Sequence, residues 1–184
     1  MLQPYRRHHP HPRFGAANWI TAARAVLTLV IASFAFRDPS AAAGWTAGAL
    51  AGVVAILDGV DGWVARRSGL VSTFGARFDM ETDAALLMVL STVVWRQGQA
   101  GAWVLLIGLM RYLFVAAGAP MAWWRGPLTP TRRGKTVAAV QMVTLAVALV
   151  VPRIVASAAC AAALALLVWS FAIDVGRLWR QRPV

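Results

Sequence analysis

The sequence predicts an all-α integral membrane protein with six transmembrane helices. Three observations lead to this prediction: a high apolar content, six long apolar stretches, and basic residues that alternate along the chain. The 184-residue chain is 59% hydrophobic and only 14% charged, with a mean hydropathy of +0.62. Soluble domains are usually about 45–50% apolar, so most of this chain is expected to lie in a bilayer.

Each apolar stretch is close to the length that a helix needs to cross a hydrocarbon core of about 30 Å. A basic leader rich in Pro and His, residues 1–17, precedes the first span, and its prolines exclude a long helix there. Asn18 is expected to cap the first span. The six-helix domain covers 18–176, and a basic tail follows at 177–184. The predicted spans are 18–36, 41–57, 79–95, 101–124, 136–151 and 154–175.

The second span carries glycines at every fourth position, Gly44, Gly48 and Gly52. Such a ridge of small residues allows another helix to approach closely. We expect that partner to be a helix of the same chain.

The basic residues are divided unevenly between the two sides that the predicted spans define. Twelve Arg and Lys residues flank one set of span ends and three flank the other. By the positive-inside rule, both termini then face the cytoplasm, and the protein is expected in the inner (cytoplasmic) membrane. The net charge of +11 places many basic residues beside the membrane, where anionic lipid headgroups attract them. A nucleic-acid surface is the weaker alternative for this charge.

Five of the seven acidic residues lie in the stretch LDGVDGWVARRSGLVSTFGARFDMETD, which joins the second span to the third. Asp58 and Asp61 are three residues apart, so on a helix they share one face. Asp79 and Asp83 are four apart and do the same. Glu81 is rotated about 200° from Asp79 and points elsewhere. The two pairs are expected to face each other near the cytoplasmic ends of the two spans.

The gathered carboxylates predict a metal site. An ionised Asp at the centre of a transmembrane helix costs about 2.5–3.5 kcal/mol, and neighbouring carboxylates also repel one another. Bound divalent cations offset both costs. Because no His or Cys lies nearby, the all-oxygen ligands favour Mg²⁺ or Mn²⁺, and two ions could share bridging carboxylates. The predicted ligands are Asp58, Asp61, Asp79 and Asp83.

A structural ion-pair network is the alternative for the same carboxylates. Arg66, Arg67 and Arg77 are near enough in sequence to form it. Ion pairs do not require glycines, however, whereas Gly62 and Gly75 leave bare backbone beside the acids for a bulky phosphate ligand.

The spacing of these residues resembles the signature of the CDP-alcohol phosphotransferases, also called phosphatidyltransferases. All eight defined positions match in the pattern Asp58-x2-Asp61-Gly62-x2-Ala65-Arg66-x8-Gly75-x3-Asp79-x3-Asp83. The resemblance implies an enzyme of phospholipid biosynthesis that transfers the phosphatidyl group of CDP-diacylglycerol, or of another CDP-linked lipid, to an alcohol and releases CMP. It also implies a homodimer.

The resemblance further implies roles for single residues. Asp58, Asp61 and Asp79 would hold metal, and Asp83 would be the catalytic base while also touching metal. The residues implied to line the cytidine nucleotide pocket are Gly62, Ala65, Arg66 and Gly75.

The acceptor alcohol is not fixed by the signature. After Asp79 the chain lacks the Pro and Lys of many phosphatidylglycerophosphate synthases, and Ala84 replaces the Arg of many inositol-type members. A phosphorylated acceptor, such as glycerol 3-phosphate or inositol phosphate, would suit the basic residues of the fourth and fifth spans. The candidate acceptor-binding residues are Arg111, Arg132, Arg133 and Lys135. Membrane topology alone also accounts for arginines at cytoplasmic helix ends.

Two further charges lie within predicted spans. Arg24 is expected to reach either the lipid headgroups or the active site. Asp174 is expected to pair with Arg177, which is three residues further along the same helix.

Two other functions are compatible with membrane-depth carboxylates. A non-enzymatic protein that binds or transports divalent cations would spread its acids along a path through several spans. An aspartate-rich membrane prenyltransferase would carry two separated acidic motifs. The single contiguous cluster favours the phosphatidyltransferase.

Overall fold

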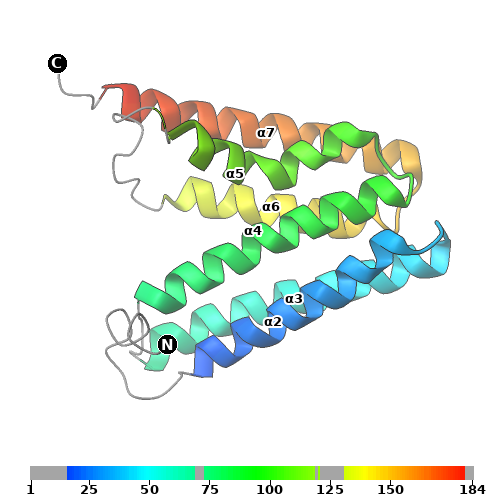
Figure 1. The fold of residues 1–184 in the computed structure, drawn as a ribbon, viewed down its shortest axis with the longest axis horizontal. Coiled ribbons are helices and arrows are strands. Elements are labelled where there is room, and N and C mark those ends of the chain that lie inside the picture. Colours follow the sequence, from blue (N-terminus) through cyan, green and yellow to red (C-terminus); the bar gives the residue numbers. More distant parts are fainter. Residues whose placement is uncertain (1–15, 69–72, 119, 121–130, 181–184) are drawn as a thin grey trace.

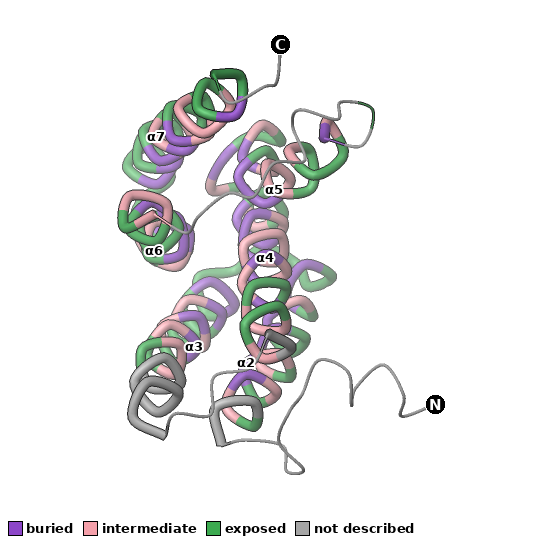
Figure 2. Tube along the Cα trace, turned by 90° about the vertical axis from the view of Figure 1, so that its left-hand side faces the viewer, coloured by how far each residue is buried: buried purple, intermediate pink, exposed green. Residues whose placement is uncertain are grey.

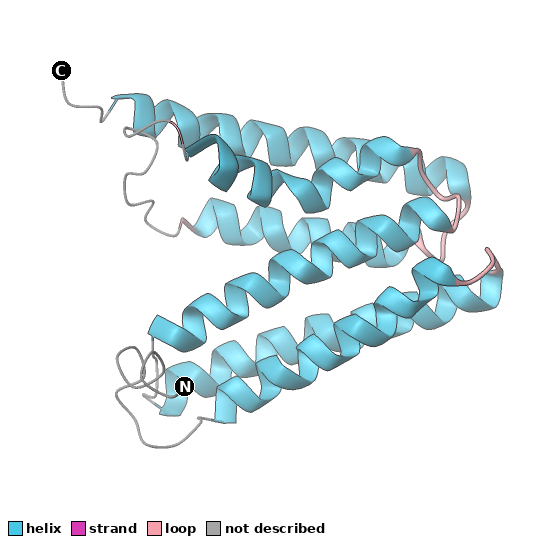
Figure 3. Ribbon diagram, in the orientation of Figure 1, coloured by secondary structure: helices cyan, strands magenta, loops and turns pink. Residues whose placement is uncertain are grey.

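The computed structural model describes residues 16–68, 73–118, 120 and 131–180, with the side chains of 16–18, 60–68 and 73–74 outside this part. Six α-helices and two short 3-10 helices make up the described part of the chain, which contains no strand (Figure 3). The all-α fold with six helices is therefore as predicted. The elements are α2 Ala16–Ser33, η1 Phe34–Phe36, α3 Ala41–Ser68, α4 Thr73–Arg96, η2 Ala102–Val104, α5 Leu105–Gly118, α6 Arg132–Ala148 and α7 Arg153–Arg180.

Three of the described helices are long and apolar enough to cross a membrane, by length and composition. Their apolar windows are Trp19–Phe36, Ala41–Gly59 and Arg153–Arg180, and Ala102–Gly118 is a shorter apolar helix. Successive helices run in opposite directions along the bundle (Figure 1). The ends of α3, α5 and α7 therefore lie at the same end of the bundle as the beginnings of α2, α4 and α6.

The described part of the acidic stretch is helical. The second span was expected to end at residue 57, but α3 continues to Ser68, and α4 begins at Thr73. No proline occurs between Pro39 and Pro120 to stop a helix, and the Ala65-Arg66-Arg67 run consists of good helix formers. Asp58 consequently lies inside a helix, with nearly three further turns after it.

Polar caps fix where two of the helices begin. The Ser40 side chain accepts a hydrogen bond from the Ala43 amide (3.1 Å) at the start of α3. The Thr131 side chain accepts one from the Gly134 amide (3.0 Å), so α6 begins at Arg132, four residues before the predicted span.

Helix α4 is central to the packing. Leu86, Leu90, Val93 and Val94 on this helix are fully buried. Both α2 and α6 pack against α3 and α4, whereas α5 packs on α4 and α7 on α6 (Figure 2). The two helices that carry the predicted metal ligands are thus held between α2 and α6.

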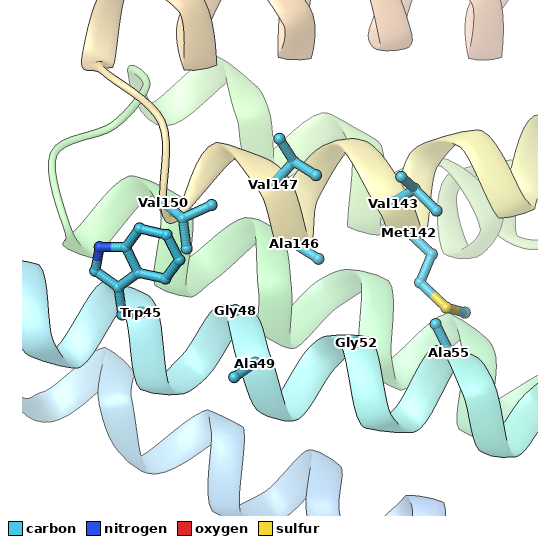
Figure 4. A pocket seen from close by; sticks show the side chains of 10 residues that line it. All are labelled: Trp45, Gly48, Ala49, Gly52, Ala55, Met142, Val143, Ala146, Val147 and Val150. Atoms are coloured by element: carbon cyan, nitrogen blue, oxygen red, sulfur yellow. The ribbon is translucent and has the colours of Figure 1, made fainter.

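The glycine ridge of α3 packs against α6, within the same chain as expected (Figure 4). A Cβ atom on Gly44 would lie 2.5 Å from the Leu149 carbonyl oxygen, and one on Gly48 would lie 3.1 Å from that of Ala146. A Cβ atom on Gly52 would meet nothing within 4 Å. The two helices therefore touch near Gly44 and separate toward Gly52.

Candidate active site

Three aspartates from two helices converge. Asp58 comes from α3, whereas Asp79 and Asp83 lie one turn apart on α4. Each offers a carboxylate oxygen, and the three oxygens all lie within 4.8 Å of one another. Asp61 follows on α3, but its side chain lies outside the described part, so its predicted place in the cluster is not tested.

A buried arginine from α2 joins the three carboxylates. Arg24 is 0% exposed, and its guanidinium lies 2.8 Å from Asp58 and 2.5 Å from Asp79 and also pairs with Asp83. Of the two places predicted for Arg24, the structure shows the one beside the acidic cluster. Arg77, a partner in the alternative ion-pair network, is exposed and forms no ion pair with any described side chain.

The cluster has chemistry that suits a divalent cation. Among these four side chains, one guanidinium faces three carboxylates, which leaves two negative charges without a counter-charge. Opposite ligands of Mg²⁺ lie about 4.2 Å apart, twice the usual Mg–O distance. Adjacent ligands lie about 3.0 Å apart, and three ligands of one ion include at most one opposite pair. These oxygens, now within 4.8 Å of one another, would therefore move closer together around a bound ion. The all-oxygen set also matches the preference of Mg²⁺ and Mn²⁺.

Glu81 points away from this cluster, as its position on the helix predicts. It pairs instead with Arg111 of α5. Arg111, a candidate for binding the acceptor, therefore has an acidic neighbour.

The basic residues at the start of α6 differ in their surroundings. Arg133 pairs with Asp174 of α7 and lies over the ring of Trp169, 5.9 Å from its centre. The predicted pairing of Asp174 with its helix neighbour Arg177 is therefore wrong, because Asp174 faces α6 instead. Arg132, the first residue of α6, is exposed.

Two cavities meet at the carboxylates. One, of about 460 Å³, lies between α3, α4 and α6 and includes Asp58. The other, of about 530 Å³, includes Arg111 and Asp174. Asp79, Asp83 and Lys135 line both cavities. A ligand in one cavity and a second ligand in the other could therefore meet at the same carboxylates.

The predicted nucleotide-binding residues lie at the same end of the bundle. Gly62, Ala65 and Arg66 are on the last turns of α3, where side chains are outside the described part. Gly75 lies in the first turn of α4, one turn before Asp79. Their role in binding the nucleotide stays a prediction.

The chain is similar in sequence to known proteins. A family model described as CDP-alcohol phosphatidyltransferase matches residues 14–169, which include Arg24 and the three converging aspartates. The chain is also 60% identical over 40 residues to CDP-diacylglycerol–inositol 3-phosphatidyltransferase 1 of Arabidopsis thaliana. That match covers 20% of this chain and spans only 18% of the relative's length.

Proposed function

The chain belongs to the CDP-alcohol phosphatidyltransferase family of enzymes, and we propose that it transfers the phosphatidyl group of CDP-diacylglycerol to a small alcohol and releases CMP. The observation that carries this proposal is the convergence of Asp58, Asp79 and Asp83 at two cavities. Membership of this family decides against the cation transporter and the prenyltransferase.

The converging aspartates, together with Asp61, are the proposed ligands of two Mg²⁺ or Mn²⁺ ions. Metal ions bound there would neutralise charge on the pyrophosphate of the donor and on the departing CMP. The two negative charges that Arg24 leaves uncompensated support this assignment.

Asp83 is the proposed general base. In the reaction, the acceptor hydroxyl oxygen attacks the phosphorus on the diacylglycerol side. The bond from that phosphorus to the bridging oxygen breaks, and its electron pair leaves with CMP. Asp83 accepts the hydroxyl proton. Its carboxylate lines both cavities, as a base must when it has to reach a hydroxyl beside the donor phosphate.

The acceptor is proposed to bind in the cavity of about 530 Å³ and to carry a phosphate, as glycerol 3-phosphate and inositol phosphate do. Lys135 and Arg111 line this cavity, so a phosphate group would meet two cationic side chains. Arg132 and Arg133 lie in the first turn of the helix that carries Lys135, but neither lines this cavity. The name of the plant relative adds free inositol to the acceptors worth testing.

The arrangement in the membrane is also part of the proposal. Both termini are assigned to the cytoplasm, and the active site to the cytoplasmic side of the inner membrane. The support is the twelve-to-three division of flanking basic residues. A homodimer stays a prediction from the family resemblance.

Release of CMP by the purified full-length protein tests the proposed reaction. Dioleoyl CDP-diacylglycerol would be supplied with Mg²⁺ or Mn²⁺ and with one acceptor at a time: glycerol 3-phosphate, inositol 1-phosphate, inositol, serine or choline. We expect release with a phosphorylated acceptor, and the lipid product identified by mass spectrometry names the alcohol. No release with any acceptor from folded, metal-loaded protein would contradict the proposal.

A further inference from the structure

We propose that Asp174 binds a hydroxyl group of the acceptor that does not react, so that the enzyme selects polyols over alcohols with a single hydroxyl. This inference rests on the function proposed above and names a specificity-determining residue for it. Asp174 lies on α7 and lines the acceptor cavity of about 530 Å³ together with the proposed base, Asp83. Among the described acids that line this cavity, Asp174 alone has no part in the proposed mechanism.

The position of Asp174 allows one acceptor to reach both carboxylates. Asp83 and Asp174 line the acceptor cavity and also a neighbouring cavity of about 250 Å³ between α4, α5, α6 and α7. Cavities of roughly 300–1,000 Å³ hold whole drug-sized ligands, so the acceptor cavity has room for a small phosphorylated polyol. Such a molecule would present one hydroxyl to Asp83 and another to Asp174.

An ion pair fixes Asp174 from outside the cavity. Its Oδ1 atom accepts a hydrogen bond from Arg133 of α6, which does not line the cavity. The Arg133 guanidinium also lies over the ring of Trp169, 5.9 Å from its centre. The Asp174 carboxylate is therefore ordered before the acceptor arrives, which lowers the entropic cost of binding.

This ion pair leaves Asp174 able to accept further hydrogen bonds. An ionised carboxylate has about four lone-pair sites on its two oxygens. Among the described residues, only Arg133 donates a hydrogen bond to it. The Asp174 side chain is 22% exposed, so the remaining sites can be reached from the cavity.

A neutral donor suits Asp174 better than a cation does, because Arg133 already balances its charge. A hydroxyl group that donates to an ionised carboxylate forms a strong, charge-assisted hydrogen bond. The acceptor phosphate would be repelled by Asp174 and attracted by Lys135, which forms no ion pair with any described side chain. The charges of the cavity thus orient a phosphorylated polyol, with its phosphate toward Lys135 and its hydroxyls toward the carboxylates.

A series of three-carbon phosphates tests the role of the second hydroxyl. Glycerol 3-phosphate carries two hydroxyls, 3-hydroxypropyl phosphate only the terminal one, and propyl phosphate none. CMP release from dioleoyl CDP-diacylglycerol with Mg²⁺ gives kcat/KM for the first two. We expect the wild type to prefer glycerol 3-phosphate about 10–100-fold, the effect of one hydrogen bond to a charged group. Inositol 1-phosphate and its monodeoxy analogues make the same comparison if the wild type uses an inositol acceptor.

Asp174→Asn should reduce this preference about tenfold, because the amide accepts a hydrogen bond without the help of a charge. Glu81→Gln is the matched control and should keep the preference of the wild type. Glu81 also pairs with an arginine at this cavity, Arg111, but does not itself line the cavity.

Binding of propyl phosphate separates hydroxyl recognition from a purely structural role of the ion pair. Measured by titration calorimetry, Asp174→Asn should bind glycerol 3-phosphate about tenfold more weakly than the wild type does. It should bind propyl phosphate at least as tightly, since a negative charge has been removed beside the phosphate. Equal weakening for both ligands would show that Asp174 only maintains the shape of the cavity, and would overturn the inference.

Arg133→Gln combined with Asp174→Asn removes both charges together, and should repeat the loss of preference if Asp174→Asn folds poorly. A wild type that does not distinguish the acceptor with a second hydroxyl from the one without it would overturn the inference. So would an Asp174→Asn variant with the preference of the wild type, or CMP release by the wild type only with serine or choline. Absence of CMP release with any acceptor would instead refute the proposed function.

Discussion

The guanidinium of Arg24 on α2 lies 2.5 Å from the carboxylate of Asp79 on α4. The same guanidinium lies 2.8 Å from Asp58 on α3, so one side chain links the two helices that carry the acidic cluster. Arg24 is fully buried, whereas the carboxylates are partly exposed toward the cavities. Helix α2 therefore contributes to the carboxylate cluster, although the acidic signature lies entirely on the next two helices.

Replacement of Arg24 by Met should destabilise the protein. The change leaves three neighbouring carboxylates without their shared cation. Loss of one partner of a buried ion pair costs about 3–5 kcal/mol, and the partial exposure of these carboxylates reduces the expected cost to about 2 kcal/mol. Thermal unfolding in detergent without added metal measures the effect. Arg77→Met, at an exposed position on α4, is the control, and equal melting temperatures for the two variants would contradict the assigned role of Arg24.

Replacement of Asp79 by Asn should weaken metal binding. It removes one of three converging carboxylates and changes the size of the side chain very little. We expect Mn²⁺ affinity, measured by titration calorimetry, to fall at least tenfold, since loss of even an outer-shell partner costs about 10–100-fold. Glu81→Gln on the same helix is the control, because Glu81 faces Arg111 rather than the cluster. A similar loss in both variants would mean that overall acidity, not the converging geometry, determines metal affinity.

Replacement of Lys135 by Gln should impair acceptor binding. Lys135 lines both cavities and forms no ion pair with any described side chain, so its charge is available to a ligand. We expect KM for a phosphorylated acceptor to rise about tenfold, the effect of losing one charge-assisted hydrogen bond, with an unchanged melting temperature. Arg132→Gln, at the exposed first position of α6, should change KM little. Equal effects of the two changes on KM would exclude a specific role for Lys135.

Replacement of Gly44 by Ala should disturb the contact between α3 and α6. The added Cβ atom would lie 2.5 Å from the backbone oxygen of Leu149, which cannot move aside as a flexible side chain can. Overpacking of this kind costs about 1–3 kcal/mol. Gly52→Ala is the matched control and should leave the melting temperature unchanged or raise it, because Ala favours a helix over Gly by about 1 kcal/mol. A Gly44→Ala variant as stable as Gly52→Ala would contradict the close contact.

The sequence predicts the six helices well, because each contains one of the apolar stretches, and three of them are long and apolar enough to cross a membrane. It predicts the end of α3 poorly. The apolar run stops near residue 57, but no proline occurs before Ser68, and α3 continues through Gly59 and Gly62. Hydropathy therefore locates the part of a helix that suits the bilayer rather than the whole helix.

Local spacing predicts part of the site. The periodicity of α4 places Asp79 and Asp83 on one face and Glu81 on another, as the structure shows. Partners that are distant in sequence cannot be found in this way. Arg24 precedes Asp79 by 55 residues, and Arg133 pairs with Asp174 across two helices, 41 residues apart. The charge of Arg24 inside an apolar helix fits snorkelling to the headgroups equally well.

The rate of CMP release by the Asp83→Asn variant tests the central claim most directly. The measurement would use saturating dioleoyl CDP-diacylglycerol, Mn²⁺ and the acceptor that the wild type uses, with Glu81→Gln as the control. We expect Asp83→Asn to lose at least 10²-fold in kcat, the usual contribution of a positioned general base, and Glu81→Gln to retain activity close to that of the wild type. An Asp83→Asn variant that is as active as Glu81→Gln would contradict the assignment of Asp83 and the active site built around it.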